Sequence, residues 1–145
     1  QMSHPGTDSH GAIRAEFPGG WADHDTNAFT GEGLSRRERA AQEFTRTLLN
    51  WRRQATVIHH GKFMHFTPVG SVYAYFRYDD EETIMVIFNL DDDELELDMA
   101  RFAERLKGAT RATSVLDETT VDLSGSLRLQ PKSAMLLEID HRSAP

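Results

Sequence analysis

The sequence contains no cysteine, so disulfide bonds and thiolate chemistry are excluded. No apolar run approaches the roughly 20 residues of a membrane-spanning helix, and we therefore expect no membrane partner. Positive charge is scarce as well: 16 lysines and arginines stand against 23 aspartates and glutamates, for a formal net charge of -7. Nucleic-acid binding needs clustered cations, so this balance argues against a nucleic-acid partner.

Residues 1–20 are polar and rich in glycine, without the apolar centre of a signal peptide. The cellular location is left open, and the signal of an exported parent protein would lie upstream. The sequence also lacks a glycine-rich phosphate loop and a Gly-x-Ser-x-Gly nucleophile motif, and it implies no cofactor. The 145 residues, 39% hydrophobic and 27% charged, suffice for one ordinary domain or a small domain with an appendage.

The first 33 residues have the composition of a long loop. Six of the ten glycines of the chain precede Leu34, and the large apolar residues there follow neither a helical nor a strand period. Loops beyond about 12–15 residues are uncommon inside a compact domain. We therefore interpret this stretch as part of a larger protein.

A helix is predicted over residues 35–53. Ser35 and Glu38 have the spacing of a capping box at its start. Apolar side chains then recur at helical spacing on one face: Ala41, Phe44, Leu48 and Trp51. This face is expected to pack against another part of a protein.

Short strands are predicted from residue 57 onward, because β-branched and aromatic residues alternate with turn signals. The expected strands cover residues 62–66, 72–78, 83–90, 94–98, 112–116, 126–129 and 134–139. The acidic stretch 79–82 should close a hairpin, and residues 99–106 have a helical period that ends before Gly108. Several short strands separated by turns favour an antiparallel β-sandwich.

Two stretches are more specific than these periodicities: GAIRAEFPGGWADHDTNAFT at residues 11–30, and LLNWRRQATVIHHGKFMHF at residues 48–66, followed by YAYFRYDD. In this order they resemble the C-terminal part of α-amylase-superfamily glycoside hydrolases, in the cyclomaltodextrinase and neopullulanase-like branch. The resemblance implies a mainly β fold, an amylase domain C-like antiparallel sandwich, preceded by a long loop and one amphipathic helix of a (β/α)8 barrel.

By this resemblance, residues 1–56 are the loop and last helix of an incomplete catalytic barrel, and residues 57–145 are the C-terminal sandwich. The parent enzyme would cleave α-glucosidic bonds in cyclodextrins, pullulan or maltooligosaccharides. The implied partners are the α-glucan or cyclodextrin substrate and the missing barrel, and the exposed helix face could self-associate. Retaining enzymes of this kind use two carboxyl groups about 5 Å apart. No segment here matches those motifs, so we expect no catalysis by this chain alone.

Substrate contact is predicted for Asp8, Arg14 and Trp21. Sugars are bound by planar polar side chains and by aromatic faces, and related enzymes place an Asp and an Arg in this loop. The Asp8 to Arg14 spacing is longer than in the usual form of that motif. In the alternative interpretation Arg14 pairs with Asp23 or Asp25 to brace the loop, while Trp21 packs on the barrel.

Two groups superficially resemble metal sites. The first is His59, His60 and His65, but two adjacent histidines on a strand would point to opposite faces and chelate poorly. A turn made by His60, Gly61 and Lys62 at the domain junction is the favoured interpretation. Asn89, Asp91 and Asp93 lack the glycine and glutamate of a calcium-binding EF-hand loop, which favours a solvated acidic turn. No metal site is predicted.

An aromatic platform for a glycan could form from Tyr73, Tyr75, Phe76 and Tyr78. Tyr73, Tyr75 and Arg77 share one face of their strand, so a surface site is geometrically possible. Packing against the core or the barrel is the favoured interpretation. The alternative function is an independent β-sandwich module that binds carbohydrate or protein, with the first 56 residues as an arm.

Overall fold

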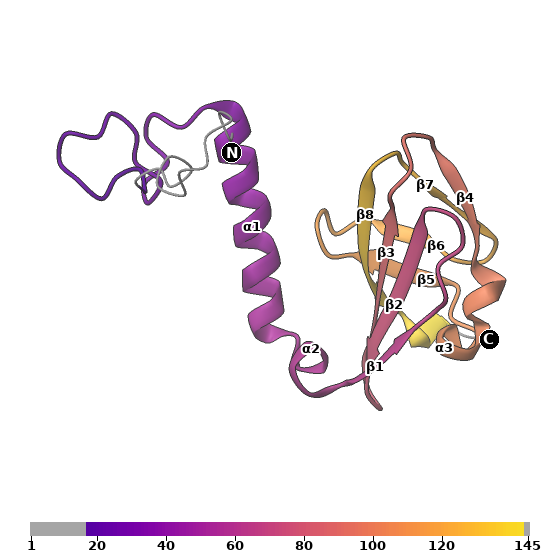
Figure 1. Ribbon diagram of the computed structural model, residues 1–145. Helices are drawn as coiled ribbons and strands as arrows, with labels where there is room; N and C mark the ends of the chain where they lie inside the picture. Colours follow the sequence, from indigo (N-terminus) through magenta and orange to yellow (C-terminus); the bar gives the residue numbers. More distant parts are fainter. Residues whose placement is uncertain (1–16, 144–145) are drawn as a thin grey trace. The chain divides into compact units, whose positions relative to one another are not determined.

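The computed structural model describes residues 17–143 (Figure 1), so Asp8 and Arg14 lie outside the described range. The chain forms two compact units, the first ending at Thr45 and the second beginning at Arg46. In the part of the chain that the structure describes, no helix has both the length and the apolar character needed to span a bilayer.

The first unit contains the loop 17–33 and the beginning of α1, Arg36–Gln54. The predicted capping box is confirmed: the backbone N–H of Glu38 donates to Ser35 Oγ at 3.3 Å, and the N–H of Ser35 donates to Glu38 Oε2 at 2.9 Å. No side chain of α1 is fully buried. Phe44 is 53% exposed and Leu49 is 57% exposed, so the helix presents apolar surface.

The second unit holds the β-domain. After α2, Thr56–His60, come the strands β1 Lys62–His65, β2 Val72–Tyr78, β3 Thr83–Asn89, β4 Leu95–Asp98, β5 Arg111–Ser114, β6 Thr120–Asp122, β7 Ser126–Leu129 and β8 Ser133–Ile139. The seven strands expected from the sequence are confirmed to within two residues at their ends. Helix α2 and strand β6 were not predicted from the sequence. Both are very short, and α2 lies where a β segment was expected to begin.

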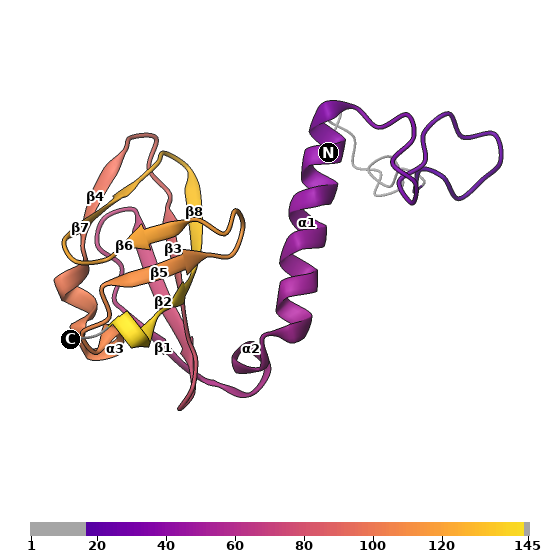
Figure 2. The ribbon, with the colours of Figure 1, turned by 180° about the vertical axis from the view of Figure 1, so that it is seen from behind.

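The strands form two antiparallel sheets (Figures 1 and 2). Six strands make the large sheet in the order β1-β2-β3-β8-β5-β6, and β4 pairs with β7 in a separate ribbon. The acidic hairpin between β2 and β3 is confirmed, with Tyr78 paired to Thr83. This is the mainly antiparallel, amylase C-terminal-like β-domain that the sequence predicts.

One main core lies between the sheets. Alternate residues of the large sheet, such as Phe76, Met85 and Leu137, join Leu97 and Leu129 from the ribbon. The two helical turns between β4 and β5, η1 Met99–Phe102 and α3 Ala103–Leu106, contribute further buried side chains. The helix stops where Lys107 adopts a left-handed conformation, with φ 51°, and Gly108 follows with φ 85°.

The acidic turn after β3 is built around a buried side chain. Asn89 is 1% exposed, and its Nδ2 donates to the carbonyl oxygens of Asp93 at 2.9 Å and Gln130 at 3.0 Å. Its Oδ1 accepts the N–H of Asp91 at 2.9 Å. The carboxylates of Asp92 and Asp93 are exposed, as a solvated turn requires, whereas the side chain of Asn89 is buried.

Candidate functional site

The first candidate site is the loop 17–33. Trp21 is 67% exposed there, beside a hollow of about 560 Å³. The hollow is lined by Gly19, Gly20, Trp21, Ala22, His24, Asp25, Asn27 and Glu32. An exposed indole among amide, imidazole and carboxylate groups is suited to contact a sugar. Of the three predicted substrate-binding residues, only Trp21 lies within the described range.

The loop is held by polar contacts made within it. The N–H of Gly19 donates to His24 Nδ1 at 2.9 Å. Asn27 Oδ1 accepts the N–H groups of Phe29 at 2.9 Å and Thr30 at 3.1 Å. Gly19 has φ 94°, and a Cβ there would lie 2.6 Å from Asn27 Oδ1. Glycine is therefore required at this position by both conformation and space.

The loop is also tied to the first turns of α1. Arg39 Nη2 donates to the carbonyl oxygen of Gly31 at 2.8 Å, and Gln42 Nε2 donates to that of Ala28. Neither contact could be predicted from the sequence, because a polar residue on an exposed helix face has no pattern that points to a distant carbonyl. The alternative brace through Arg14 involves a residue outside the described range.

The second candidate site is the face of the large sheet that points away from the core. Ala74 and Phe76 of β2 are buried in the core, so Tyr73, Tyr75 and Arg77 lie on the opposite face. The strand register places further apolar side chains beside them on this outer face: Phe63, Ile84, Val86, Phe88 and Leu136.

Aromatic rings run across this outer face. The Phe63 ring centroid lies 5.5 Å from that of Tyr75, and Tyr73 lies 6.5 Å from Phe88 with an interplanar angle of 9°. Phe63 is 53% exposed, while the other three rings are partly buried by one another. Partial burial raises the pKa of Tyr75. Phe76 and Tyr78 of the same strand pack with the core, as the favoured interpretation expects, whereas Tyr73 and Tyr75 lie on the outer face.

One corner of the outer face is covered by α2. Val57 is 0% exposed and packs with Ile84 and Val86, and Arg77 Nη2 donates to the carbonyl oxygen of Ile58 at 3.0 Å. Helix α2 carries His59, whose Nε2 lies 2.8 Å from the carbonyl oxygen of Arg52.

His59 and His60 belong to the single turn of α2 and not to a strand, and the bend expected at the junction lies at Gly61. Within residues 17–143, no three histidine or acidic side chains gather closely enough to share an ion.

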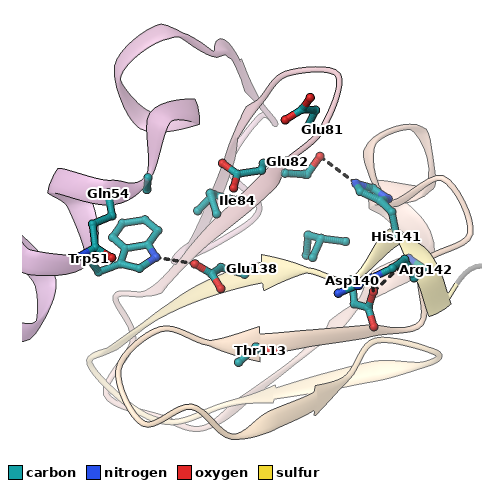
Figure 3. A pocket seen from close by; sticks show the side chains of 13 residues that line it. Trp51, Gln54, Glu81, Glu82, Ile84, Thr113, Glu138, Asp140, His141 and Arg142 are labelled. Atoms are coloured by element: carbon teal, nitrogen blue, oxygen red, sulfur yellow. Dashed lines mark hydrogen bonds and ion pairs between the residues drawn. The ribbon is translucent and has the colours of Figure 1, made fainter.

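The third candidate site is a cleft of about 590 Å³ between the end of α1 and the sheet (Figure 3). Trp51 stands on one side, with the hairpin carboxylates Glu81 and Glu82 above. Glu138 of β8 forms the floor, and its Oε1 accepts the indole N–H of Trp51 at 2.5 Å. The remaining wall residues are Gln54, Ala55, Thr83, Ile84, Thr113, Ile139, Asp140, His141 and Arg142.

The far side of this cleft contains a partly buried histidine. His141 Nε2 lies 2.9 Å from Oγ1 of Thr83, a residue only 4% exposed. Burial lowers the pKa of His141, and the positive charges of Lys107 and Arg105 lower it further. This cleft was not predicted from the sequence, because its walls come from segments far apart along the chain: α1, the β2–β3 hairpin and the C-terminal turn.

Comparisons with known proteins agree with this architecture. Residues 63–138 match the family described as the cyclo-malto-dextrinase C-terminal domain. Among solved structures, AmyP in complex with maltose is 14% identical over 74% of this chain and 22% of its own, with a TM-score of 0.64. The trehalulose synthase MutB from Pseudomonas mesoacidophila MX-45 is 22% identical over 68% of this chain and 18% of its own, with a TM-score of 0.55.

A MutB mutant in complex with its substrate sucrose gives the same identity and coverage, with a TM-score of 0.55. At these identities the structural likeness establishes the fold. The chain spans about a fifth of the length of the solved proteins that it matches.

Proposed function

Because the chain belongs to the cyclomaltodextrinase C-terminal domain family, we propose that it completes an α-amylase-family hydrolase of α-glucosidic bonds. Its substrates would be cyclodextrins, pullulan or maltooligosaccharides. Residues 1–56 would supply a substrate-cleft loop and the last helix of the catalytic barrel. Residues 57–145 would form a β-sandwich that stabilises this barrel.

The outer face of the large sheet carries this proposal. An antiparallel sheet with one solvated face normally alternates apolar and polar residues. Here both faces are apolar, and the outer one presents Phe63, Tyr73, Tyr75, Phe88 and Leu136. Contiguous apolar patches of this kind mark interaction surfaces. A catalytic barrel that precedes the domain in the same polypeptide is the partner that the family membership favours.

The loop 17–33 supports the second half of the proposal. Loops that follow barrel strands build the active sites of (β/α)8 enzymes. Trp21 offers an exposed ring on a loop held by His24 and Asn27. The structural relatives AmyP and MutB were solved with maltose and with sucrose, which favours a sugar as the ligand of this loop.

The scaffold role predicts that one substitution has different effects in two contexts. Phe63→Ser should change the free energy of unfolding of the isolated chain by less than about 1 kcal/mol, because Phe63 is already 53% exposed. In the parent enzyme the same change should cost about 2–4 kcal/mol, because it would remove a buried aromatic ring from the contact with the barrel. Urea denaturation of both proteins measures the difference. Equal losses in the two contexts would refute the scaffold role.

The substrate role of the loop predicts an effect on catalysis. In the parent enzyme, Trp21→Ala should lower kcat/KM for maltooligosaccharides by about tenfold, since a stacked aromatic ring contributes about 1–1.5 kcal/mol. Phe29→Ala removes an aromatic side chain that is 72% exposed in the same loop and should leave kcat/KM unchanged. The isolated chain should release no reducing sugar. Unchanged kinetics for Trp21→Ala, or turnover by the pure isolated chain, would count against this role.

A further inference from the structure

We propose that the cleft beside Trp51 is a second sugar site, which binds a neutral glycosyl unit independently of the loop that carries Trp21. All of its walls come from residues 51–142, within one compact unit. The inference therefore does not rest on the barrel or on the proposed catalytic role of the parent enzyme.

The cleft has an aromatic wall with a fixed orientation. Trp51 packs against the cluster of Val57, Ile84 and Val86. Its indole N–H is bound to Glu138 Oε1 at 2.5 Å. These two contacts restrain both ends of the ring, and Figure 3 shows it standing at the side of the cleft. A sugar could then pack its C–H groups on a ring that needs little reordering, which lowers the entropic cost of binding.

The polar side chains of the cleft are suited to hydroxyl groups. Gln54, Glu82 and Thr113 make no side-chain hydrogen bond within residues 17–143. They offer an amide, a carboxylate and a hydroxyl, which together can donate to and accept from a polyol. Glu138 adds a carboxylate on the floor of the cleft. A purely apolar ligand would desolvate these groups without replacing their hydrogen bonds, so it is disfavoured.

Charge restricts the ligand further. Glu81, Glu82 and Glu138 face the cleft, whereas the cation Arg142 is paired with Asp140 at 3.7 Å. This excess of carboxylates repels phosphorylated or acidic sugars and leaves neutral sugars as the class that fits. The volume of about 590 Å³ is within the usual range of small-ligand sites.

The site can be tested with its own tryptophan. The chain has 2 tryptophans, so Trp21→Ala leaves Trp51 as the only one and also removes the aromatic ring of the loop site. Titration of this variant with maltotriose should change the Trp51 fluorescence in a saturable way, with half-saturation at about 1–10 mM. Glucose should produce a weaker saturable change, and glucose 6-phosphate should produce none.

Two added substitutions assign the signal to the cleft. Glu138→Gln keeps an oxygen acceptor for the Trp51 N–H but removes the charge, and should weaken maltotriose binding about tenfold. Gln54→Ala, at an exposed position, should weaken it severalfold and serves if Glu138→Gln does not fold. Glu104→Gln, the same charge change at an exposed position of α3, should have no effect.

Several outcomes would overturn the proposal. No saturable change up to about 100 mM maltotriose would exclude a sugar site of any useful affinity. Equal binding by the Glu138→Gln and Glu104→Gln variants would place the sugar elsewhere. Saturation by guanidinium ions but not by sugar would show that the cleft receives a cationic side chain instead.

Discussion

At the scale of single residues, burial decides what similar side chains do. Asn89 and Asp91 stand two positions apart in one acidic turn. Asn89 is 1% exposed and its side chain bonds to four backbone groups, whereas Asp91 accepts a hydrogen bond from Ser71 Oγ at 3.0 Å, which lowers the pKa of Asp91. The amide of Asn89 both donates and accepts, whereas an ionised aspartate at this position could only accept. The sequence shows the residue type but not the carbonyls that surround it.

His141 gives a prediction about pH at this scale. Its pKa in the folded state is lowered from 6.5, first by burial and then by Lys107 and Arg105, with Asp140 opposing. Protonation therefore favours the unfolded chain. The contribution of neutral His141 should be complete above about pH 6.5 and should be lost as the pH falls through the lower folded-state pKa.

Urea denaturation at about pH 7.5 and pH 5 tests this prediction. The urea midpoint should be lower at the acidic pH than at the higher one. This decrease should be smaller for His141→Gln, whose side chain can still bond to Thr83. His65→Gln, at an exposed position on β1, serves as the control and should retain the full decrease. An identical decrease in the wild-type and His141→Gln chains would contradict the assignment.

At the scale of elements, the junction between α2 and β1 depends on one glycine. Gly61 has φ -65°, which any residue can adopt, but a Cβ there would lie 2.4 Å from the carbonyl oxygen of Val57 and 2.9 Å from that of Tyr78. Both atoms belong to the backbone and cannot easily move. The constraint is therefore one of space rather than of conformation.

Gly61→Ala should lower the free energy of unfolding by about 1–3 kcal/mol, the usual cost of inserting a carbon into a packed site. Urea denaturation measures this loss. Gly125→Ala is the matched control, because nothing lies within 4 Å of a Cβ at that glycine. A Gly61→Ala chain as stable as the control would show that α2 shifts away from β2 without cost.

The elements that the sequence predicts well have patterns extending over a full turn or strand. The capping box of Ser35 and the apolar run of β3 are local, and both are found in the structure. Helix α2 and strand β6 are set by tertiary contacts: α2 through Val57, and β6 through its pairing with β5. Such short segments carry too few residues for a period to show.

The candidate sites also differ in whether a local sequence pattern or a tertiary contact defines them. Trp21 could be named because it belongs to a recognisable stretch of sequence. The cleft beside Trp51 could not, because the register of β8 against β3 brings Glu138 beside Ile84, and α1 adds the indole from 87 positions away along the chain. No local sequence pattern predicts the contact between Trp51 and Glu138.

At the scale of the whole molecule, the apolar side of α1 predicts self-association of the isolated chain. Phe44 is 53% exposed and lies on the same helix face as Leu48. Exposed apolar patches promote association. Light scattering should show a mass that rises with concentration, and Phe44→Ser should reduce this rise. Asn50→Ser, at another exposed position of the helix, should not. A constant monomer mass at high concentration would contradict the prediction.

Strand β8 is the last strand along the chain, yet it lies between β3 and β5 near the middle of the large sheet. During synthesis on the ribosome, β3 and β5 therefore have no shared neighbour until residues 133–139 emerge. Pairing between such distant segments is slow to form. During that interval the apolar strands made earlier can mispair with other strands. We therefore expect the domain to remain prone to aggregation until the last residues of β8 have been synthesised.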